Sequence, residues 1–113
     1  MKSFKILSLL LVAFSFQAMA QKELITVEIN VDGVCGMCKT RIENALDVKG
    51  VKMANWTAST HTCKIVYRED KISEEEIHQL LNAAGHDTEK SIASDEEYAG
   101  VHGCCKYREH EDH

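Results

Sequence analysis

The sequence contains no proline, so its turns must form at glycine, asparagine, aspartate and serine. It also lacks an internal repeat, a glycine-rich loop that could cradle phosphate, and a Ser/His/Asp arrangement. No pair of carboxylates stands in an obvious catalytic setting. These absences predict that the protein is not an enzyme.

No lysine-rich or arginine-rich patch offsets the acidic residues. If Lys2 and Lys5 are removed with a targeting segment, 11 basic residues face 18 acidic residues, a net charge of −7 with histidine neutral. An acidic chain of this size is poorly suited to bind nucleic acid or an anionic membrane. The charge is compatible with a protein that handles cations, although it does not by itself identify one.

The apolar run at residues 6–16 is too short to span a membrane. It follows a basic start and precedes Ala18-Met19-Ala20, a pattern typical of a signal peptide. We therefore interpret residues 1–20 as a signal peptide cleaved near Ala20-Gln21, with a permanent membrane anchor as the alternative. This interpretation predicts a periplasmic or secreted protein, in an oxidising compartment where unprotected thiols tend to pair.

Cys35 and Cys38 form a C-x-x-C pair between an alternating apolar run and a helix-period run. The pair is thus expected in a loop that leads into the first turn of a helix. Unpaired N–H groups and the positive end of the helix dipole favour a thiolate there. This spacing lets two sulfurs converge on one soft metal ion or join as a disulfide.

Alternating and helix-period patterns predict an α+β protein with the order βαββαβ. The expected elements are strand 25–31, helix 40–48, strands 51–56 and 63–67, helix 73–84 and a short edge strand at 87–92. The residues expected to face the core from the helices are Ile42, Ala45, Leu46, Ile77, Leu80, Leu81 and Ala84. Ser73 to Glu76 read as a capping box, and Gly85 ends the second helix. This order predicts an antiparallel sheet with both helices on one face.

From Leu24 to about Glu89 the sequence resembles the heavy-metal-associated domain, a family that includes copper chaperones, domains of metal-transporting ATPases and periplasmic mercury-binding proteins. The matching features are a first strand running into Cys35-x-x-Cys38, then Ile42, Leu46, Gly50-Val51 and Gly85. The resemblance implies a ferredoxin-like fold, with the domain at residues 21–92 and a Cys/His-rich tail at 93–113. The family usually has a methionine packed under the loop, two residues before the first cysteine. Gly33 stands there, which predicts a looser or differently folded loop.

The resemblance implies that Cys35 and Cys38 are the primary ligands of a soft heavy-metal ion that the domain transfers or sequesters. Cu(I) is favoured, because two thiolates suit a nearly linear site, while Hg(II) and Zn(II) are alternatives. Zn(II) would require about four ligands. The expected partner is a metal-transporting membrane protein or another metal-binding domain, and we expect a monomer, with a metal-bridged dimer as the alternative. A thiol–disulfide redox protein using the same pair is the competing hypothesis.

His86, Cys104 and Cys105 are candidate additional ligands. His86 follows the second helix, in a loop expected beside the C-x-x-C loop, where it would bind the metal or support it through a hydrogen bond. The tail is long enough to return to Cys35 and Cys38, so Cys104 or Cys105 could complete the site or form a disulfide. A separate second site in the tail, with His102, His110 and His113, and a solvated terminus are the alternatives.

Two further expectations concern the core. Cys63 alternates in phase with Ile65 and Tyr67, so we interpret it as a small buried residue and not as a ligand. None of the expected core lies in residues 102–113, so their deletion is expected to leave the fold intact.

Overall fold

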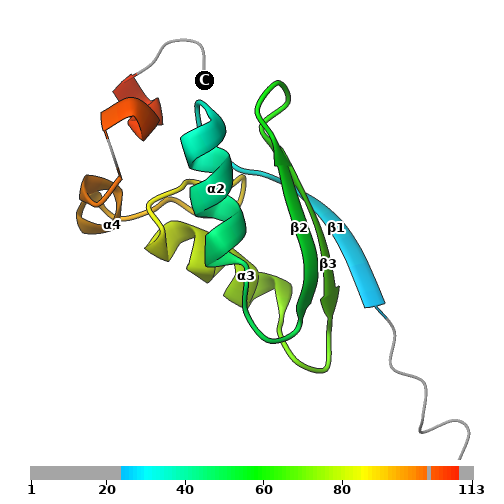
Figure 1. The fold of residues 1–113 in the computed structure, drawn as a ribbon. Helices are drawn as coiled ribbons and strands as arrows, with labels where there is room; N and C mark the ends of the chain where they lie inside the picture. Colours follow the sequence, from blue (N-terminus) through cyan, green and yellow to red (C-terminus); the bar gives the residue numbers. More distant parts are fainter. Residues whose placement is uncertain (1–23, 102, 110–113) are drawn as a thin grey trace, which may run out of the picture.

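A computed structural model describes residues 24–101 and 103–109 of the chain (Figure 1). Its elements are β1 (Leu24–Asn30), α2 (Gly36–Ala45), β2 (Val51–Thr57), β3 (Thr62–Arg68), α3 (Glu74–Ala83), α4 (Asp95–Ala99) and two 3-10 turns, η1 (Gly103–Cys105) and η2 (Tyr107–Glu109). The expected signal peptide at residues 1–20 and the histidines at 102, 110 and 113 lie outside the described residues. Within those residues, no helix has the length and apolar character needed to cross a membrane.

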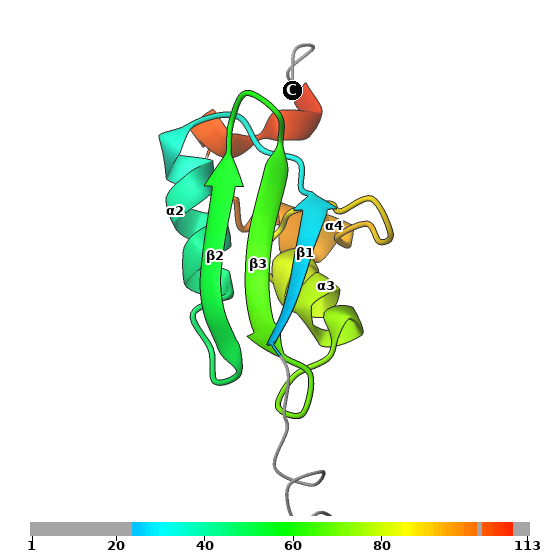
Figure 2. The same cartoon turned by 90° about the vertical axis from the view of Figure 1, so that its right-hand side faces the viewer.

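The three strands form one antiparallel sheet in the order β1-β3-β2. In this register Ile65 at the centre of β3 lies opposite Val27 of β1 and Ala54 of β2. Helices α2 and α3 lie on the same face of the sheet (Figure 2). This arrangement confirms the predicted α+β, ferredoxin-like architecture, with both helices on one side of an antiparallel sheet.

The core lies between that sheet face and the two helices, as the apolar periods predicted. Ile42 of α2 and Leu46 at its C-cap are buried four residues apart, and so are Ile77 and Leu81 of α3, a spacing of about one helical turn. The strands contribute buried side chains at alternate positions, among them Ile29, Cys63, Ile65 and Tyr67. Apolar area removed from water stabilises a domain by about 25 cal/mol per Å², so this layer is the main source of its stability.

The predicted edge strand at 87–92 is wrong, because the chain turns back after a single bridge between Val31 and Thr88. The backbone N–H of Thr88 donates to the carbonyl of Ser91 at 2.8 Å. The Thr88 hydroxyl accepts from the N–H groups of Lys90 and Ser91, at 3.3 and 3.1 Å. Such local side-chain bonds give the backbone an alternative to a strand ladder. Periodicity alone did not reveal this competition.

After the turn at Thr88 to Ser91, the C-terminal segment (residues 93–109) packs against the helices, with α4 contacting α3 and η1 contacting α2. Ser94 caps α4 with a complete capping box, since its hydroxyl accepts from Glu97 N–H and the Glu97 carboxylate accepts from Ser94 N–H. The S-x-x-E pattern could have predicted this helix from the sequence. Gly85, at φ +96°, follows the C-cap residue of α3. A Cβ at this position would lie 2.3 Å from the Val101 side chain. Only glycine allows the segment to pack this closely.

The expectation that residues 102–113 contribute nothing to the core is also wrong. Tyr107 is fully buried, and its ring stacks on His86 with centroids 5.4 Å apart. Its hydroxyl donates to the Gly85 carbonyl at 2.6 Å and accepts from the Asp87 N–H at 2.9 Å. Truncation at residue 102 would therefore remove part of the folded domain. Hydrophobic periodicity could not predict the burial of Tyr107, because a single aromatic residue forms no repeating pattern.

Arg108 also anchors the C-terminal segment, through an ion pair with Asp87. Its guanidinium donates to both carboxylate oxygens of Asp87, at 2.8 and 3.1 Å, and to the Ala93 carbonyl at 2.7 Å. It also lies over the Tyr98 ring, 4.3 Å from the centroid. The Arg108 side chain, with the Ala93 N–H, holds the pKa of Asp87 below its ordinary value of 3.8, although burial opposes this. A bidentate pair of this kind is stronger than an ordinary surface ion pair.

Because the folded-state pKa of Asp87 is lowered, its contribution to stability is present above pH about 4 and is lost as the pH falls through the folded value. We expect Asp87→Asn to lower the free energy of unfolding by about 1–3 kcal/mol at pH 7. The difference from the unsubstituted protein should shrink below pH 4, as measured by urea unfolding across pH. Asp95→Asn is the matched control, since Asp95 is fully exposed and 3.7 Å from Arg108. An equal loss in both variants would contradict the prediction.

Candidate metal centre

The loop before α2 is packed on Trp56, which is fully buried. The indole N–H donates to the Val31 carbonyl at 2.9 Å. A Cβ at Gly33 would lie 2.9 Å from the Trp56 ring and 3.1 Å from Cys38 Cβ, so glycine lets the ring approach the loop. The loop is therefore supported by an aromatic ring from β2, and the absence of the family's methionine does not leave it unsupported. No local pattern predicts this contact, because it joins residues 23 positions apart.

Cys35 is the N-cap residue of α2, and Cys38 lies within its first turn. The pair lies at a helix N-terminus, as predicted, but α2 begins at Gly36 and not at residue 40, so Cys38 is part of the helix and not of the loop. The N–H of Met37 faces the Cys35 sulfur and lowers the pKa of this thiol, more strongly than partial burial raises it. The N–H of Cys38 lowers it further. The lowered pKa of Cys35 agrees with its place at the positive end of a helix.

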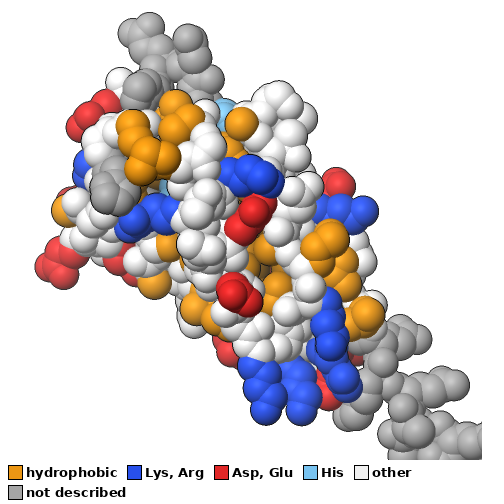
Figure 3. Space-filling model, viewed as in Figure 1, with side chains coloured by type: hydrophobic (Ala, Val, Ile, Leu, Met, Phe, Trp, Pro, Cys, Tyr) orange, Lys and Arg blue, Asp and Glu red, His pale blue; other side chains and the backbone are white. Residues whose placement is uncertain are grey.

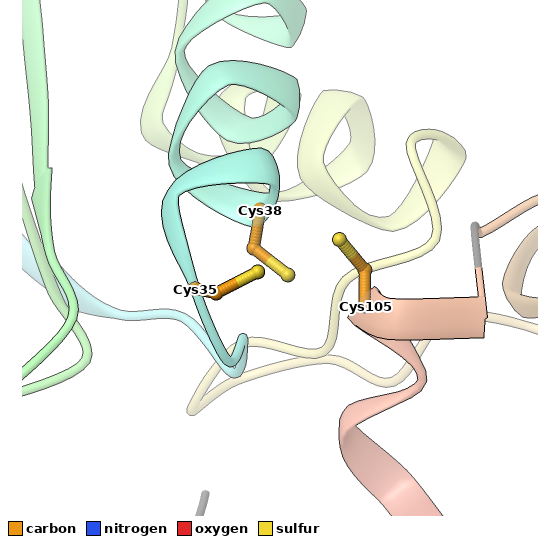
Figure 4. A group of neighbouring side chains, drawn as sticks. All are labelled: Cys35, Cys38 and Cys105. Carbon is orange, nitrogen blue, oxygen red and sulfur yellow. The ribbon is translucent and has the colours of Figure 1, made fainter.

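Cys105 of η1 completes a group of three thiols. The sulfur atoms of Cys35, Cys38 and Cys105 all lie within 4.8 Å of one another. They point toward a common centre from the loop before α2, the first turn of α2 and the C-terminal segment (Figure 4). Cys38 and Cys105 are fully buried, while Cys35 is half-buried. All five cysteines of the chain are free thiols in the structure.

Burial raises the pKa of Cys105, and the adjacent sulfurs of Cys38 and Cys104 raise it further. A cation at the centre of the group would displace this proton, because thiolates and not thiols bind metals. Cys63 lies apart from the group and is fully buried in β3. Burial raises its pKa to about 12. Its location agrees with its interpretation as a core residue.

His86 lies beside the loop, as expected, but it is not a member of the three-thiol group. Its Nδ1–H donates to the Asp32 carbonyl at 2.7 Å, which leaves Nε2 as the unprotonated nitrogen. Nε2 is buried and has no hydrogen-bond partner among the described residues. Burial lowers the pKa of this imidazole. The hydrogen bond positions the loop through its backbone, and a supporting role for His86 stays a prediction.

Cys104 is exposed and lies outside the group of three. Its sulfur is 3.1 Å from the Met37 sulfur and 4.0 Å from the Cys105 sulfur. Met37 was not among the predicted site residues. Its place between the two cysteines at the start of a helix was the available signal.

Residues 28–87, more than half of the chain, match the heavy-metal-associated domain family. The chain belongs to this family. The match includes Cys35 and Cys38 and ends before α4, so Cys104, Cys105 and Tyr107 lie outside it. No curated protein matches the chain.

Several solved structures share the fold of this heavy-metal-associated domain. The CopZ metallochaperone is 26% identical, with 57% of this chain and 98% of that chain covered and a TM-score of 0.55. The water-soluble region of the P-type ATPase CopA from Bacillus subtilis is 26% identical, with 60% and 46% covered and a TM-score of 0.57. Oxidized MerP from Ralstonia metallidurans CH34 is 24% identical, with 58% and 94% covered and a TM-score of 0.55, and it supports the fold alone.

Proposed function

We propose that this heavy-metal-associated domain binds Cu(I) through Cys35, Cys38 and Cys105 and delivers or sequesters it after export. The observation that carries the proposal is the convergence of the three sulfur atoms within 4.8 Å. Soft thiolates select Cu(I), Zn(II) and Hg(II) over hard cations. The CopZ metallochaperone and the ATPase CopA share the fold, so a metal-transporting membrane protein or a second metal-binding domain is the partner we expect.

The number of ligands in the group, three thiols, favours a low coordination number. For a metal–sulfur bond of about 2.3 Å, sulfurs lie about 4.0 Å apart in a trigonal site and about 4.6 Å apart in a linear one. Both separations fit within the 4.8 Å that limits the group. Zn(II) prefers four ligands, and no fourth His, Cys, Asp or Glu among residues 24–101 and 103–109 joins the three. Cu(I) therefore suits the three thiols better than Zn(II).

Transfer would proceed by ligand exchange. A thiolate of the partner attacks the bound ion, a shared intermediate forms, and thiolates of this protein leave one by one. Cys35 is the accessible ligand, since Cys38 and Cys105 are buried. We propose that the domain acts as a monomer, because the third thiolate comes from its own chain and not from a second copy.

The direct test is an anaerobic titration of the reduced protein with Cu(I) and, in parallel, Zn(II), followed by native mass spectrometry. We expect Cu(I) to bind to the monomer and to compete successfully with Zn(II). Binding of neither metal would overturn the proposal and leave thiol–disulfide exchange as the use of these cysteines. Cu(I) appearing only in dimers would replace the intramolecular site with a shared one.

Cys105→Ser tests the third ligand. Structural zinc sites bind with about 10–16 kcal/mol, or roughly 3 kcal/mol per ligand, so loss of one thiolate should weaken Cu(I) binding by about 100-fold. The affinity is measured by competition with a chromophoric Cu(I) chelator. Cys63→Ala is the matched control, because it also removes a buried thiol but lies outside the group. Equal affinities in the two variants would show that the pair Cys35 and Cys38 binds the ion alone.

A further inference from the structure

The sulfur atoms of Met37 and Cys104 form a second cluster next to the three thiols. From their geometry we propose that Cys104, Met37 and Cys105 bind a second Cu(I) ion, with the Cys105 thiolate bridging it to the first. The proposal rests on the proposed function, because the bridging thiolate belongs to the first site. It adds a ligand set that the heavy-metal-associated domain itself does not supply, since Cys104 and Cys105 lie outside the family match.

The cluster joins two elements far apart in the sequence. Met37 is the second residue of α2, and Cys104 is the central residue of η1. Their sulfur atoms are 3.1 Å apart, and the Cys104 sulfur lies 4.0 Å from that of Cys105. Five sulfur atoms therefore form a continuous chain from Met37 through Cys104 and Cys105 to Cys35 and Cys38.

Packing does not account for the position of Met37, because half of this apolar side chain is exposed. Apolar side chains, a class that includes cysteine and methionine here, gather on the surface where α2 begins and the C-terminal segment crosses it (Figure 3). A disulfide between Cys104 and Cys105 would close a strained ring, since adjacent cysteines rarely have the required geometry. In the structure the Cys104 thiol donates to the Met37 sulfur, and a soft metal ion would use both of these sulfurs as ligands.

The separations suit a Cu(I) ion. The 4.0 Å between the Cys104 and Cys105 sulfurs equals the separation of about 4.0 Å that a trigonal site with 2.3 Å bonds requires. The Met37 thioether must move outward by roughly 1 Å, which its three rotatable bonds and its exposure allow. A thioether is a soft, neutral ligand that suits Cu(I) and is not among the ligands that proteins use for Zn(II). The second site should therefore discriminate between the two metals.

The charges also favour a bridged pair. One Cu(I) ion with three thiolates carries a net charge of −2 in a partly buried site, and isolated buried charge is costly. A second Cu(I) ion, with the added Cys104 thiolate and the neutral Met37, keeps the total at −2 and spreads it over two ions. The Cys104 proton passes to the buffer when its copper–sulfur bond forms, and copper stays as Cu(I) throughout.

The test is the stoichiometry of the reduced protein under anaerobic conditions, measured by native mass spectrometry with Cu(I) and separately with Zn(II). We expect two Cu(I) ions but only one Zn(II) ion per monomer. Cys104→Ser should remove the second Cu(I) ion and keep the first, and Met37→Leu should weaken the second ion at least tenfold. Met53→Leu is the matched control, because Met53 is similarly exposed but lies on β2, and it should retain both ions.

X-ray absorption of the fully loaded protein should show a copper–copper contribution, which is absent in Cys104→Ser. A single Cu(I) ion in the unsubstituted protein, or a second ion unaffected by Cys104→Ser, would overturn the second site and leave the proposed function in place. Two ions carried only by dimers would assign the cluster to the contact between copies and also overturn the proposal. Failure to bind any Cu(I) would instead refute the proposed function.

Discussion

Replacing Cys35 and Cys38 together with serine should lower the affinity for Cu(I) by at least about 10⁴-fold. With roughly 3 kcal/mol for each thiolate, the loss of two ligands costs about 6 kcal/mol of binding free energy. The two residues stand at the N-terminus of α2, where the N–H of Met37 lowers the pKa of Cys35 and the helix dipole favours a thiolate. Serine keeps the size of the side chain but offers a hard oxygen that is protonated at neutral pH.

The measurement is anaerobic competition with a chromophoric Cu(I) chelator, with circular dichroism to check that the double variant folds. Cys63→Ala serves again as the control that removes a buried thiol outside the group. A surviving high affinity would place the primary site in the C-terminal segment, at Cys104 and Cys105, and would refute the central role of the C-x-x-C pair.

Tyr107→Ala should destabilise the domain by about 3–5 kcal/mol, the usual cost of removing a buried aromatic ring. Tyr107 is fully buried, stacks on His86 and meets the Tyr98 ring edge-on with centroids 5.1 Å apart. Its loss leaves a cavity beneath the segment that carries Cys105. We therefore expect a lower midpoint in urea unfolding and, in molecules that remain folded, weaker Cu(I) binding.

Tyr107→Phe separates the ring from its hydroxyl. It keeps the packing but leaves the Gly85 carbonyl and the Asp87 N–H without this partner, at a cost of about 1–3 kcal/mol. Its affinity for Cu(I) should stay close to that of the unsubstituted protein, because the segment still packs on the domain. If Tyr107→Ala unfolds with the same midpoint as the unsubstituted protein, the segment does not belong to the cooperative core.

Local patterns predicted most of the domain correctly. Strands with alternating apolar residues and helices with an apolar stripe need only neighbours in sequence to be recognised, and β1, α2, β2, β3 and α3 all form. The error at residues 87–92 arose where polar side chains bond to nearby backbone, since Thr88 forms a turn in place of a strand. Helix α4 was not predicted, although the capping box of Ser94 and Glu97 is visible in the sequence.

The sequence by itself determined that Cys35 and Cys38 lie at a helix N-terminus, because their spacing and the flanking periods are local properties. It also placed Cys63 in the core by its phase along a strand. Only the tertiary structure decided which tail cysteine reaches the pair. Adjacent residues of a 3-10 turn point in different directions, so Cys105 faces Cys35 and Cys38 while Cys104 meets Met37. That choice depends on where Tyr107 and Arg108 anchor the chain, through contacts across the sequence that no local period encodes.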